Sequence, residues 1–507
     1  MILAIFQRLR SSPTGLTALT GYAAMLSTLV VGLFSVPLAL HFLTNEEFGL
    51  WSVVGQSLGY LLLLDFGVSW SASRMLVAPL REGNLEELES WWTVIVTVLC
   101  FQGLLVAGLG FAATDYIINF FKLSKELIPA AEILWGGMIL INAIQLPFRA
   151  YTGILYCQDR WYVMHLISIL TSWINLIAFA ALLLAGYRTS AYLVASGLSI
   201  AANSLLMRHM VRKSGTRLRL SRRAFDFDKL RVLFRYSSGL FLLALAAQIT
   251  FMTQSIIIGK VVGLGAVAAF VVSSKSLAVV MQLVKRAFES FSPRWMQLYV
   301  SGDKQEIWNQ WRRLMAWLLP AGMMGALGIL IFNRSFSMLY GGAENHVSRL
   351  FDLLLAGGLV AQVFINFTSF VFPISARIKG WCLAGLGDAV LQVVFGILFT
   401  RWYGSAGLLV GTLLGPLLVS VPYLLLKAPG ELGISRRAMA GEVVRPYALT
   451  FAALIACFFI LNTPAATPAG WWPSNIEFLL GFGLAALGVI WFCKFRVLFS
   501  GAKRVEI

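Results

Sequence analysis

The segment AVAAFVVSSKSLAVVMQLVKRAFES, residues 266–290, is an apolar run long enough to form a membrane-spanning helix, and it carries Lys275 near its middle. A lysine at the centre of a bilayer costs about 2.5–3.5 kcal/mol on insertion scales, so we expect Lys275 to face other helices or water rather than lipid. At about 100° per residue, Gln282, Arg286 and Glu289 fall within about 40° of Lys275. The segment therefore predicts a helix with one polar stripe, which is typical of a cavity wall.

The composition of the whole chain also indicates a membrane protein. Of its 507 residues, 59% are hydrophobic and only 12% are charged, and the mean hydropathy is +0.79. A helix needs about 20 apolar residues to cross the hydrocarbon, and the chain divides into about fourteen such runs with no barrel-like alternation. We therefore predict an all-α polytopic membrane protein. The predicted spans are 17–42, 50–72, 91–113, 127–147, 162–185, 190–207, 236–259, 266–288, 314–333, 350–373, 382–400, 405–426, 446–462 and 477–493.

The net charge of +17 follows the loops rather than one folded surface. Of the 40 Lys and Arg residues, 32 lie at the chain ends and in alternate loops, whereas 7 lie in the remaining loops. Because cytoplasmic loops carry the excess of positive charge, we expect both termini in the cytoplasm and a multi-pass protein of the cytoplasmic membrane. Ten of these charges lie between spans six and seven, where we expect contact with anionic membrane lipids. No nucleic-acid partner is expected, since that requires a basic folded surface.

An internal repeat divides the chain. FGLWSVVGQSL at 48–58 aligns with VAAFVVSSKSL at 267–277, an offset of 219 residues that also aligns LREGNLEELESWW with YVSGDKQEIWNQW. Like-oriented repeats are typical of transporters whose substrate site lies at the repeat interface, so we expect two pseudo-symmetric six-helix lobes followed by two further helices. The predicted parts are an N-terminal lobe at 1–207, a basic cytoplasmic linker at 208–235, a C-terminal lobe at 236–426, and the last two spans with the tail at 427–507.

Several other predicted spans carry polar side chains on one helical face. Such groups either line a shared cavity or join helices, and Arg149 has the further alternative of reaching the membrane interface. We favour the cavity because the final three spans carry almost no such groups. Including the charged residues, the candidates for substrate binding are Lys275, Arg149, Arg286, Arg74, Gln145, Asn142, Gln282, Gln248, Gln362 and Asn366.

Two carboxylates within predicted spans are candidates for coupling or gating. Asp65 lies in the inner third of span two, and Asp388 lies four residues before Gln392 in span eleven. An intramembrane carboxylate can take up a proton, pair with a cation on a neighbouring helix, or hold a gate together. All three roles stay open for Asp65, and Asp388 is the weaker candidate.

Catalytic and cofactor signatures are missing from the sequence. It has no GxxxxGK[ST] phosphate loop, its four histidines are isolated, and its five cysteines have no paired spacing. The outer loops are also too short for the catalytic carboxylates of a membrane glycosyltransferase. We therefore expect no enzyme activity, no cofactor and no metal site.

The segment FLTNEEFGLWSVVGQSLGYLLLLDFGVSWSASR, residues 42–74, resembles the amino-terminal region of the O-antigen and polysaccharide-repeat flippases of the MATE-like, or MOP, exporter superfamily. In that family a glycine follows an acidic pair, Leu-Trp comes next, and the second span ends in Asp, Gly and Arg. The matching residues are Glu46, Glu47, Phe48, Gly49, Leu50, Trp51, Asp65, Gly67 and Arg74.

The resemblance implies a V-shaped pair of lobes with a cationic cavity, in which alternating access moves an undecaprenyl-diphosphate-linked oligosaccharide outward for surface polysaccharide biosynthesis. A diphosphate that enters a low-dielectric cavity must meet positive charge. Lys275 is the candidate at mid-depth, Arg149, Arg286 and Arg74 are candidates at the inner mouth, and the amides would contact sugar hydroxyls. A polysaccharide polymerase and glycosyltransferases are the implied protein partners.

Two other functions remain open. A cation-coupled exporter of drugs or metabolites on the same fold predicts more acidic residues in the first lobe than Asp65 alone. A membrane enzyme or scaffold of polysaccharide assembly predicts a catalytic outer loop.

Overall fold

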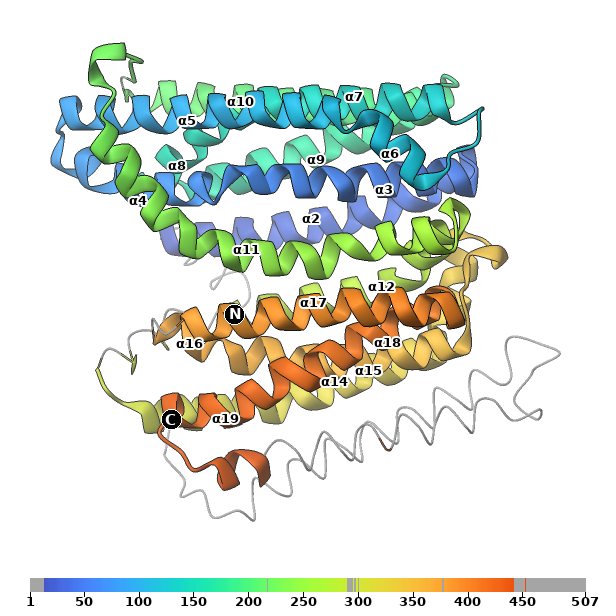
Figure 1. The fold of residues 1–507 in the computed structure, drawn as a ribbon. Helices are drawn as coiled ribbons and strands as arrows, with labels where there is room; N and C mark the ends of the chain where they lie inside the picture. Colours follow the sequence, from blue (N-terminus) through green and yellow to red (C-terminus); the bar gives the residue numbers. More distant parts are fainter. Residues whose placement is uncertain are drawn as a thin grey trace, which may run out of the picture. The chain divides into compact units, whose positions relative to one another are not determined.

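The computed structural model describes residues 13–216, 218–289, 301–375 and 378–441, together with Trp295, Leu298, Tyr299 and Ala452. Every regular element in these ranges is a helix (Figure 1). The predicted spans 446–462 and 477–493 lie outside the described residues. The helices form two compact units, the first ending at Ala268 and the second beginning at Ala269.

In the first unit α9 packs between α2 and α10, α5 lies along α7, and α4 packs against α5 and α8 (Figure 1). One core of this unit joins α4, α5, α8 and α10 through fully buried side chains such as Leu76, Ile95 and Ile154. The elements of the first unit are α2 (Pro13–Phe42), α3 (Asn45–Leu61), η1 (Leu62–Asp65), α4 (Val68–Glu82), α5 (Leu85–Ala112), α6 (Thr114–Phe121), α7 (Ile128–Gln145), η2 (Leu146–Phe148), α8 (Arg149–Cys157), α9 (Trp161–Leu184), α10 (Arg188–Lys213), η3 (Arg222–Ala224) and α11 (Phe227–Val261).

In the second unit α17 packs along α18, and α15 packs against both α14 and α18. Helix α12 starts at the boundary between the units and continues into the second. The elements are α12 (Leu264–Glu289), α14 (Lys304–Gly341), η4 (Ala343–Asn345), α15 (Arg349–Ser369), α16 (Val371–Ile374), α17 (Ile378–Tyr403), α18 (Ser405–Gly415), the π-helical turn η5 (Pro416–Ser420) and α19 (Val421–Leu432).

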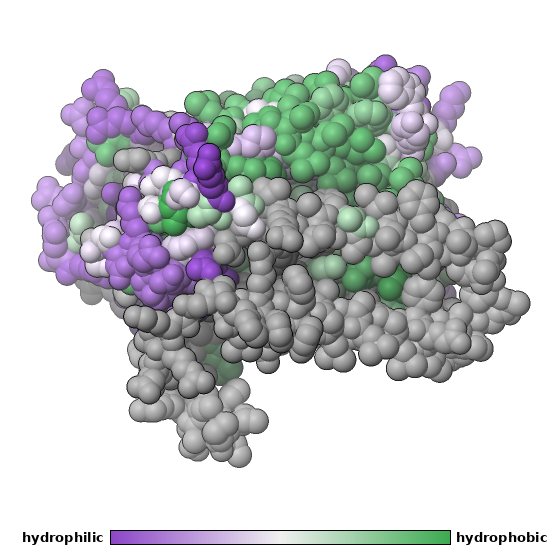
Figure 2. All heavy atoms as spheres, turned by 90° about the horizontal axis from the view of Figure 1, so that it is seen from below, coloured by the Kyte–Doolittle hydropathy of each residue, from purple (hydrophilic) through white to green (hydrophobic). Residues whose placement is uncertain are grey.

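The described residues contain eleven helices long and apolar enough to cross a membrane, and a shorter apolar segment, Leu245–Val261, matches the predicted seventh span. Large apolar side chains such as Phe34, Leu104 and Ile177 are exposed on these helices. Figure 2 shows a broad hydrophobic band with hydrophilic residues gathered at its ends. Because bulk water does not favour such a band, the chain is a multi-pass membrane protein, as its composition predicts. Fourteen spans remains a prediction.

The predicted second span, 50–72, is not one continuous helix. Helix α3 tightens into η1, and both Phe66 and Gly67 adopt left-handed backbone angles, with φ of 48° and 73°. A left-handed residue ends a right-handed helix, so α4 starts afresh at Val68. Gly67 takes this conformation without a Cβ penalty, whereas Phe66 packs its ring on Phe241 of α11, with centroids 5.2 Å apart.

The internal repeat has a local structural counterpart. At the offset of 219 residues, the start of α3 matches the start of α12, and the start of α5 matches the start of α14. Asn84 and Asp303 are the equivalent N-caps, and each side chain accepts a hydrogen bond at 3.0 Å from the backbone of a glutamate three residues later. The preceding glycines, Gly83 and Gly302, are both left-handed. The two segments therefore use the same turn to enter a long helix.

Helix α11 packs with the first unit rather than the second. Gln56 of α3 donates to Ser255 Oγ at 2.6 Å and accepts from the Ser255 backbone at 3.1 Å, and the fully buried Ser71 and Ser237 hydroxyls are 2.8 Å apart. The start of the predicted linker at 208–235 also contacts the first unit, because Gln158 donates to the Ser214 and Thr216 hydroxyls. The division by packing therefore falls at Ala268, whereas the sequence places the lobe boundary at 208–235.

The motif that carries the family resemblance builds one end of α3. Thr44 and Glu47 form a capping box, and Glu47 also accepts two hydrogen bonds from Arg188 of α10, at 2.8 and 2.5 Å. Trp51 packs against Tyr192 in a tilted arrangement, with centroids 4.6 Å apart. A Cβ at Gly49 would overlap the Leu264 carbonyl, so only glycine permits this approach. These motif residues act in packing.

Candidate functional site

The break between α3 and α4 positions the buried carboxylate of Asp65. Its Oδ1 accepts hydrogen bonds from the Ser69 backbone at 3.1 Å and from Ser69 Oγ at 3.2 Å. Gln102 of α5 donates to the Asp65 backbone carbonyl at 3.0 Å and fixes the turn from a third helix. Asp65 therefore lies at the amino-terminal end of α4, where the helix dipole favours a negative charge.

Arg149 is the charged partner of Asp65. Pro147 interrupts the fourth span at η2, and Arg149 then begins α8. Arg149 Nη1 lies 3.9 Å from Asp65 Oδ2, with 30% of the arginine side chain and 11% of the aspartate side chain exposed. No residue that the structure describes forms a hydrogen bond with the Arg149 side chain. The guanidinium thus keeps its N–H donors unused while one carboxylate balances part of its charge.

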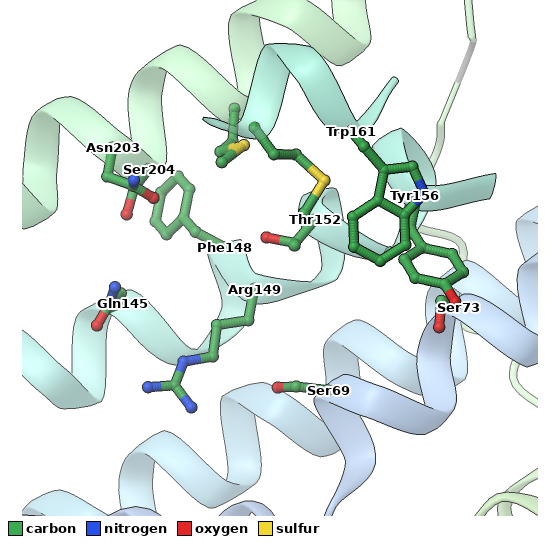
Figure 3. A pocket seen from close by; sticks show the side chains of 13 residues that line it. Ser69, Ser73, Gln145, Phe148, Arg149, Thr152, Tyr156, Trp161, Asn203 and Ser204 are labelled. Atoms are coloured by element: carbon green, nitrogen blue, oxygen red, sulfur yellow. The ribbon is translucent and has the colours of Figure 1, made fainter. Parts of the chain in front are cut away.

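Arg149 lines a cavity of about 350 Å³ inside the first unit. In Figure 3 the Arg149 side chain runs between Gln145 and Ser69, while Thr152 lies nearer the centre of the cavity. Five helices (α4, α7, α8, α9 and α10) and the η2 turn form the walls, so the cavity is supported by regular structure rather than by loops. The lining residues are Ser69, Ser73, Gln145, Phe148, Arg149, Thr152, Gly153, Tyr156, Trp161, Met164, Asn203, Ser204 and Met207.

The cavity has two chemically different ends. Arg149 and Gln145 occupy one end, and the rings of Tyr156 and Trp161 occupy the other (Figure 3). These two rings pack against each other with centroids 4.4 Å apart. Ligand sites commonly combine flat apolar walls with a few convergent polar groups. The arrangement suits a ligand that joins an anionic group to a ring with polar substituents.

The remaining predicted residues of the first unit lie elsewhere. Arg74 is exposed, donates to Tyr236 Oη at 2.9 Å and stacks on that ring. Asn142 is buried and donates to the Met138 carbonyl one turn back, at 2.8 Å. The amide of Gln248 packs against Gly59, where a Cβ would overlap it. The cavity therefore brings together Gln145 and Arg149 from the predicted set, and does not include these three.

In the second unit Lys275 is half-buried on α12. It makes no hydrogen bond or ion pair with any residue that the structure describes. Gln282, two turns further along α12, is exposed, and the side chain of Arg286 lies outside the described part of the chain. On α15 the Asn366 amide donates to the Gln362 carbonyl at 2.8 Å. A role of these residues in binding stays a prediction.

Asp388 of α17 is buried and fully engaged. One carboxylate oxygen accepts from Gln392 at 2.8 Å, and the other accepts from Ser420. Ser420 ends the π-helical turn η5, an irregularity that is common at functional positions in helices. Both side chains that meet Asp388 are neutral, so the carboxylate has no ion-pair partner among the residues described here.

The second unit also holds a buried polar network that the sequence pattern does not predict. Asp352 of α15 is fully buried, accepts from Asn333 of α14 at 2.7 Å, and lies 3.0 Å from His346 Nε2. Asn333 also donates to the Ser273 carbonyl at 3.0 Å and accepts from Ser276 at 2.7 Å. The network thus fixes the turn of α12 that carries Lys275. Its residues are far apart in sequence, so no single helical stripe reveals it.

We expect Asp352→Ala to destabilise the second unit by about 2–4 kcal/mol, because it leaves the buried Asn333 and His346 groups without their acceptor. Thermal unfolding of the purified protein measures the loss. Asp352→Asn keeps one acceptor oxygen for Asn333 and should cost less. An unchanged midpoint for the alanine variant would contradict this account of the network.

No protein-family model and no curated protein matches the chain. Solved structures do match it. An inward-facing multidrug resistance MATE family transporter of the MOP superfamily aligns with a TM-score of 0.69 and 15% identity, covering 87% of this chain and 99% of that chain. The lipid II flippase MurJ, in an inward closed conformation, also aligns with a TM-score of 0.69, at 14% identity, covering 95% of this chain and 99% of that chain. A MATE structure in the bent conformation aligns with a TM-score of 0.58 at 14% identity, over 89% and 98% of the two chains.

The chain has the fold of these membrane proteins. This agrees with the all-α, MATE-like architecture that the sequence predicts. At these identities the likeness establishes the fold but not the substrate.

Proposed function

We propose that this protein is a transporter that moves an undecaprenyl-diphosphate-linked oligosaccharide from the inner to the outer leaflet of the cytoplasmic membrane by alternating access, for surface polysaccharide biosynthesis. The MOP-type fold supports a transporter, and one of the matched structures is a flippase named for a lipid-linked substrate. The resemblance at residues 42–74 supports the more specific substrate class.

The observation that carries the proposal is Arg149, which lines the cavity and keeps its donors unused among the described residues. An intramembrane cation is costly unless it faces a cavity or a counter-charge, so its presence indicates a negatively charged ligand. A guanidinium matches phosphate especially well, because its planar fork presents parallel N–H groups to two oxygens. Arg149 would bind the diphosphate.

The other cavity groups support a sugar beside that phosphate. Gln145, Thr152 and Asn203 line the cavity and form no side-chain hydrogen bond with the described residues, so their donors and acceptors are available to hydroxyl groups. Tyr156 and Trp161 add flat surfaces for the apolar face of a ring. A lipid tail would remain in the bilayer while the headgroup occupies the cavity.

The test uses the full-length protein in proteoliposomes. A fluorescently labelled undecaprenyl-diphosphate oligosaccharide is placed in one leaflet, and its appearance in the other is followed with a membrane-impermeant quencher. We expect faster movement than in protein-free liposomes, and no uptake of the cationic dye ethidium. Ethidium transport without movement of the lipid would overturn the proposal in favour of a drug exporter.

A further inference from the structure

The Asp65 carboxylate occupies a position that is already built for an anion. One amino-terminal N–H group of α4, that of Ser69, donates to it with the backbone N 3.1 Å from Oδ1, and the Arg149 guanidinium approaches Oδ2 from α8 at 3.9 Å. A helix start and an arginine together are a common way to hold a phosphate. Here the anion held by the helix start and the arginine is the carboxylate of Asp65 itself.

The contact between Asp65 and Arg149 is a loose one. Paired arginine and carboxylate groups normally form hydrogen bonds of about 2.7–2.9 Å, often two in parallel. The bidentate pair of Arg188 with Glu47 in this same unit has distances of 2.8 and 2.5 Å. The pair at Asp65 instead has a separation of 3.9 Å and no hydrogen bond. Charge attraction therefore holds Arg149, but its donors stay available.

Asp65 is also the one carboxylate within ion-pair distance of Arg149 among the residues that the structure describes. A phosphate that binds Arg149 must therefore meet the Asp65 charge in a site where like charges repel strongly. The Ser69 hydroxyl holds the Asp65 carboxylate in place, so the carboxylate stays beside the site when a ligand binds.

We propose that Asp65 is an internal competitor for the substrate: it holds Arg149 while the cavity is empty, the substrate phosphate takes Arg149 from it, and it recaptures Arg149 to release the substrate. This inference rests on the proposed function. Asp65 acts as a positioning residue through Arg149, and it lowers the affinity for the anion so that release stays fast. An interaction that weakens binding can raise turnover when release limits the rate.

The experiment measures binding and transport separately, with full-length protein in proteoliposomes. The binding probe is farnesyl diphosphate, a short-chain polyprenyl diphosphate, titrated by calorimetry. We expect Asp65→Asn to tighten binding about tenfold, because the neutral amide no longer competes for Arg149, while transport of the labelled lipid slows. We expect Asp65→Glu to weaken binding, because its longer side chain reaches Arg149 more closely.

Weaker or unchanged binding by Asp65→Asn would overturn the inference, since a purely structural role predicts loss of both binding and transport. If Asp65→Asn does not accumulate, Asp65→Glu decides alone, and equal or tighter binding rejects the competitor role. Asp159→Asn is the matched control, because Asp159 lies 3.9 Å from Arg81 on the exposed surface. If wild-type protein neither binds the probe nor moves the lipid, the proposed function itself fails.

Discussion

Arg149→Ala is expected to lower transport of the lipid-linked oligosaccharide about 100-fold, because each hydrogen bond to a charged group that is lost costs about 1.5–3 kcal/mol. The substitution removes the cation that would meet the diphosphate. It also leaves the buried Asp65 carboxylate without its neighbour at 3.9 Å, so repulsion of the substrate increases. The measurements are the flipping rate in proteoliposomes and the affinity for farnesyl diphosphate.

Two variants distinguish this role from general damage. Arg149→Lys keeps the charge but loses the planar fork, so we expect partial activity. Arg81→Ala removes an exposed arginine that also lies 3.9 Å from an aspartate, and it should transport normally. If Arg149→Ala binds and flips the lipid as the wild type does, the substrate does not pass through this cavity.

The features predicted from the sequence are those set by local pattern. Apolar runs of sufficient length predict the helices, and matching residues such as Gly83 and Gly302 indicate the repeat. The spacing of Asn142, Gln145 and Arg149 predicts one polar face on span four. Gln145 and Arg149 line the cavity, whereas Asn142 donates to its own helix. These properties depend on residues that are neighbours in the chain.

The break in the second span was not predicted, because LLLLDFG reads as a continuous apolar helix. Phe66 adopts a left-handed conformation that phenylalanine rarely uses, in contact with Phe241, a residue about 175 positions away. The tertiary contact therefore overrides local preference. Without this break Asp65 would not lie at the start of α4 beside Arg149, so the sequence does not predict their pairing either.

The network around Asp352 was missed for a related reason. Asn333, His346 and Asp352 come from two helices and the loop between them, and none of them forms a repeating stripe with the others. His346 looks isolated in the sequence, and only the packing of α14 against α15 brings it to a carboxylate. Residues that meet across helices need the tertiary structure to be recognised.

Lys275→Ala is expected to abolish surface polysaccharide in a complementation assay while protein abundance stays unchanged. Lys275 lies in an apolar helix at a cost of about 2.5–3.5 kcal/mol, yet no described residue offsets its charge. The network of Ser273, Ser276 and Asn333 also fixes the turn that carries it. A costly cation that is held in place but left unpaired is best explained by an anionic substrate.

Lys275→Met gives the sharpest form of this prediction. Methionine keeps most of the length and apolar surface of lysine, so removing an unpaired charge from the membrane should leave the unfolding midpoint unchanged or raise it, while polysaccharide is lost. Lys275→Arg should retain part of the activity, and Lys379→Ala, at an exposed position near the start of α17, should behave as wild type. Normal polymer from Lys275→Met would show that this charge has no part in transport, and a large fall in stability would show that Lys275 serves the fold instead.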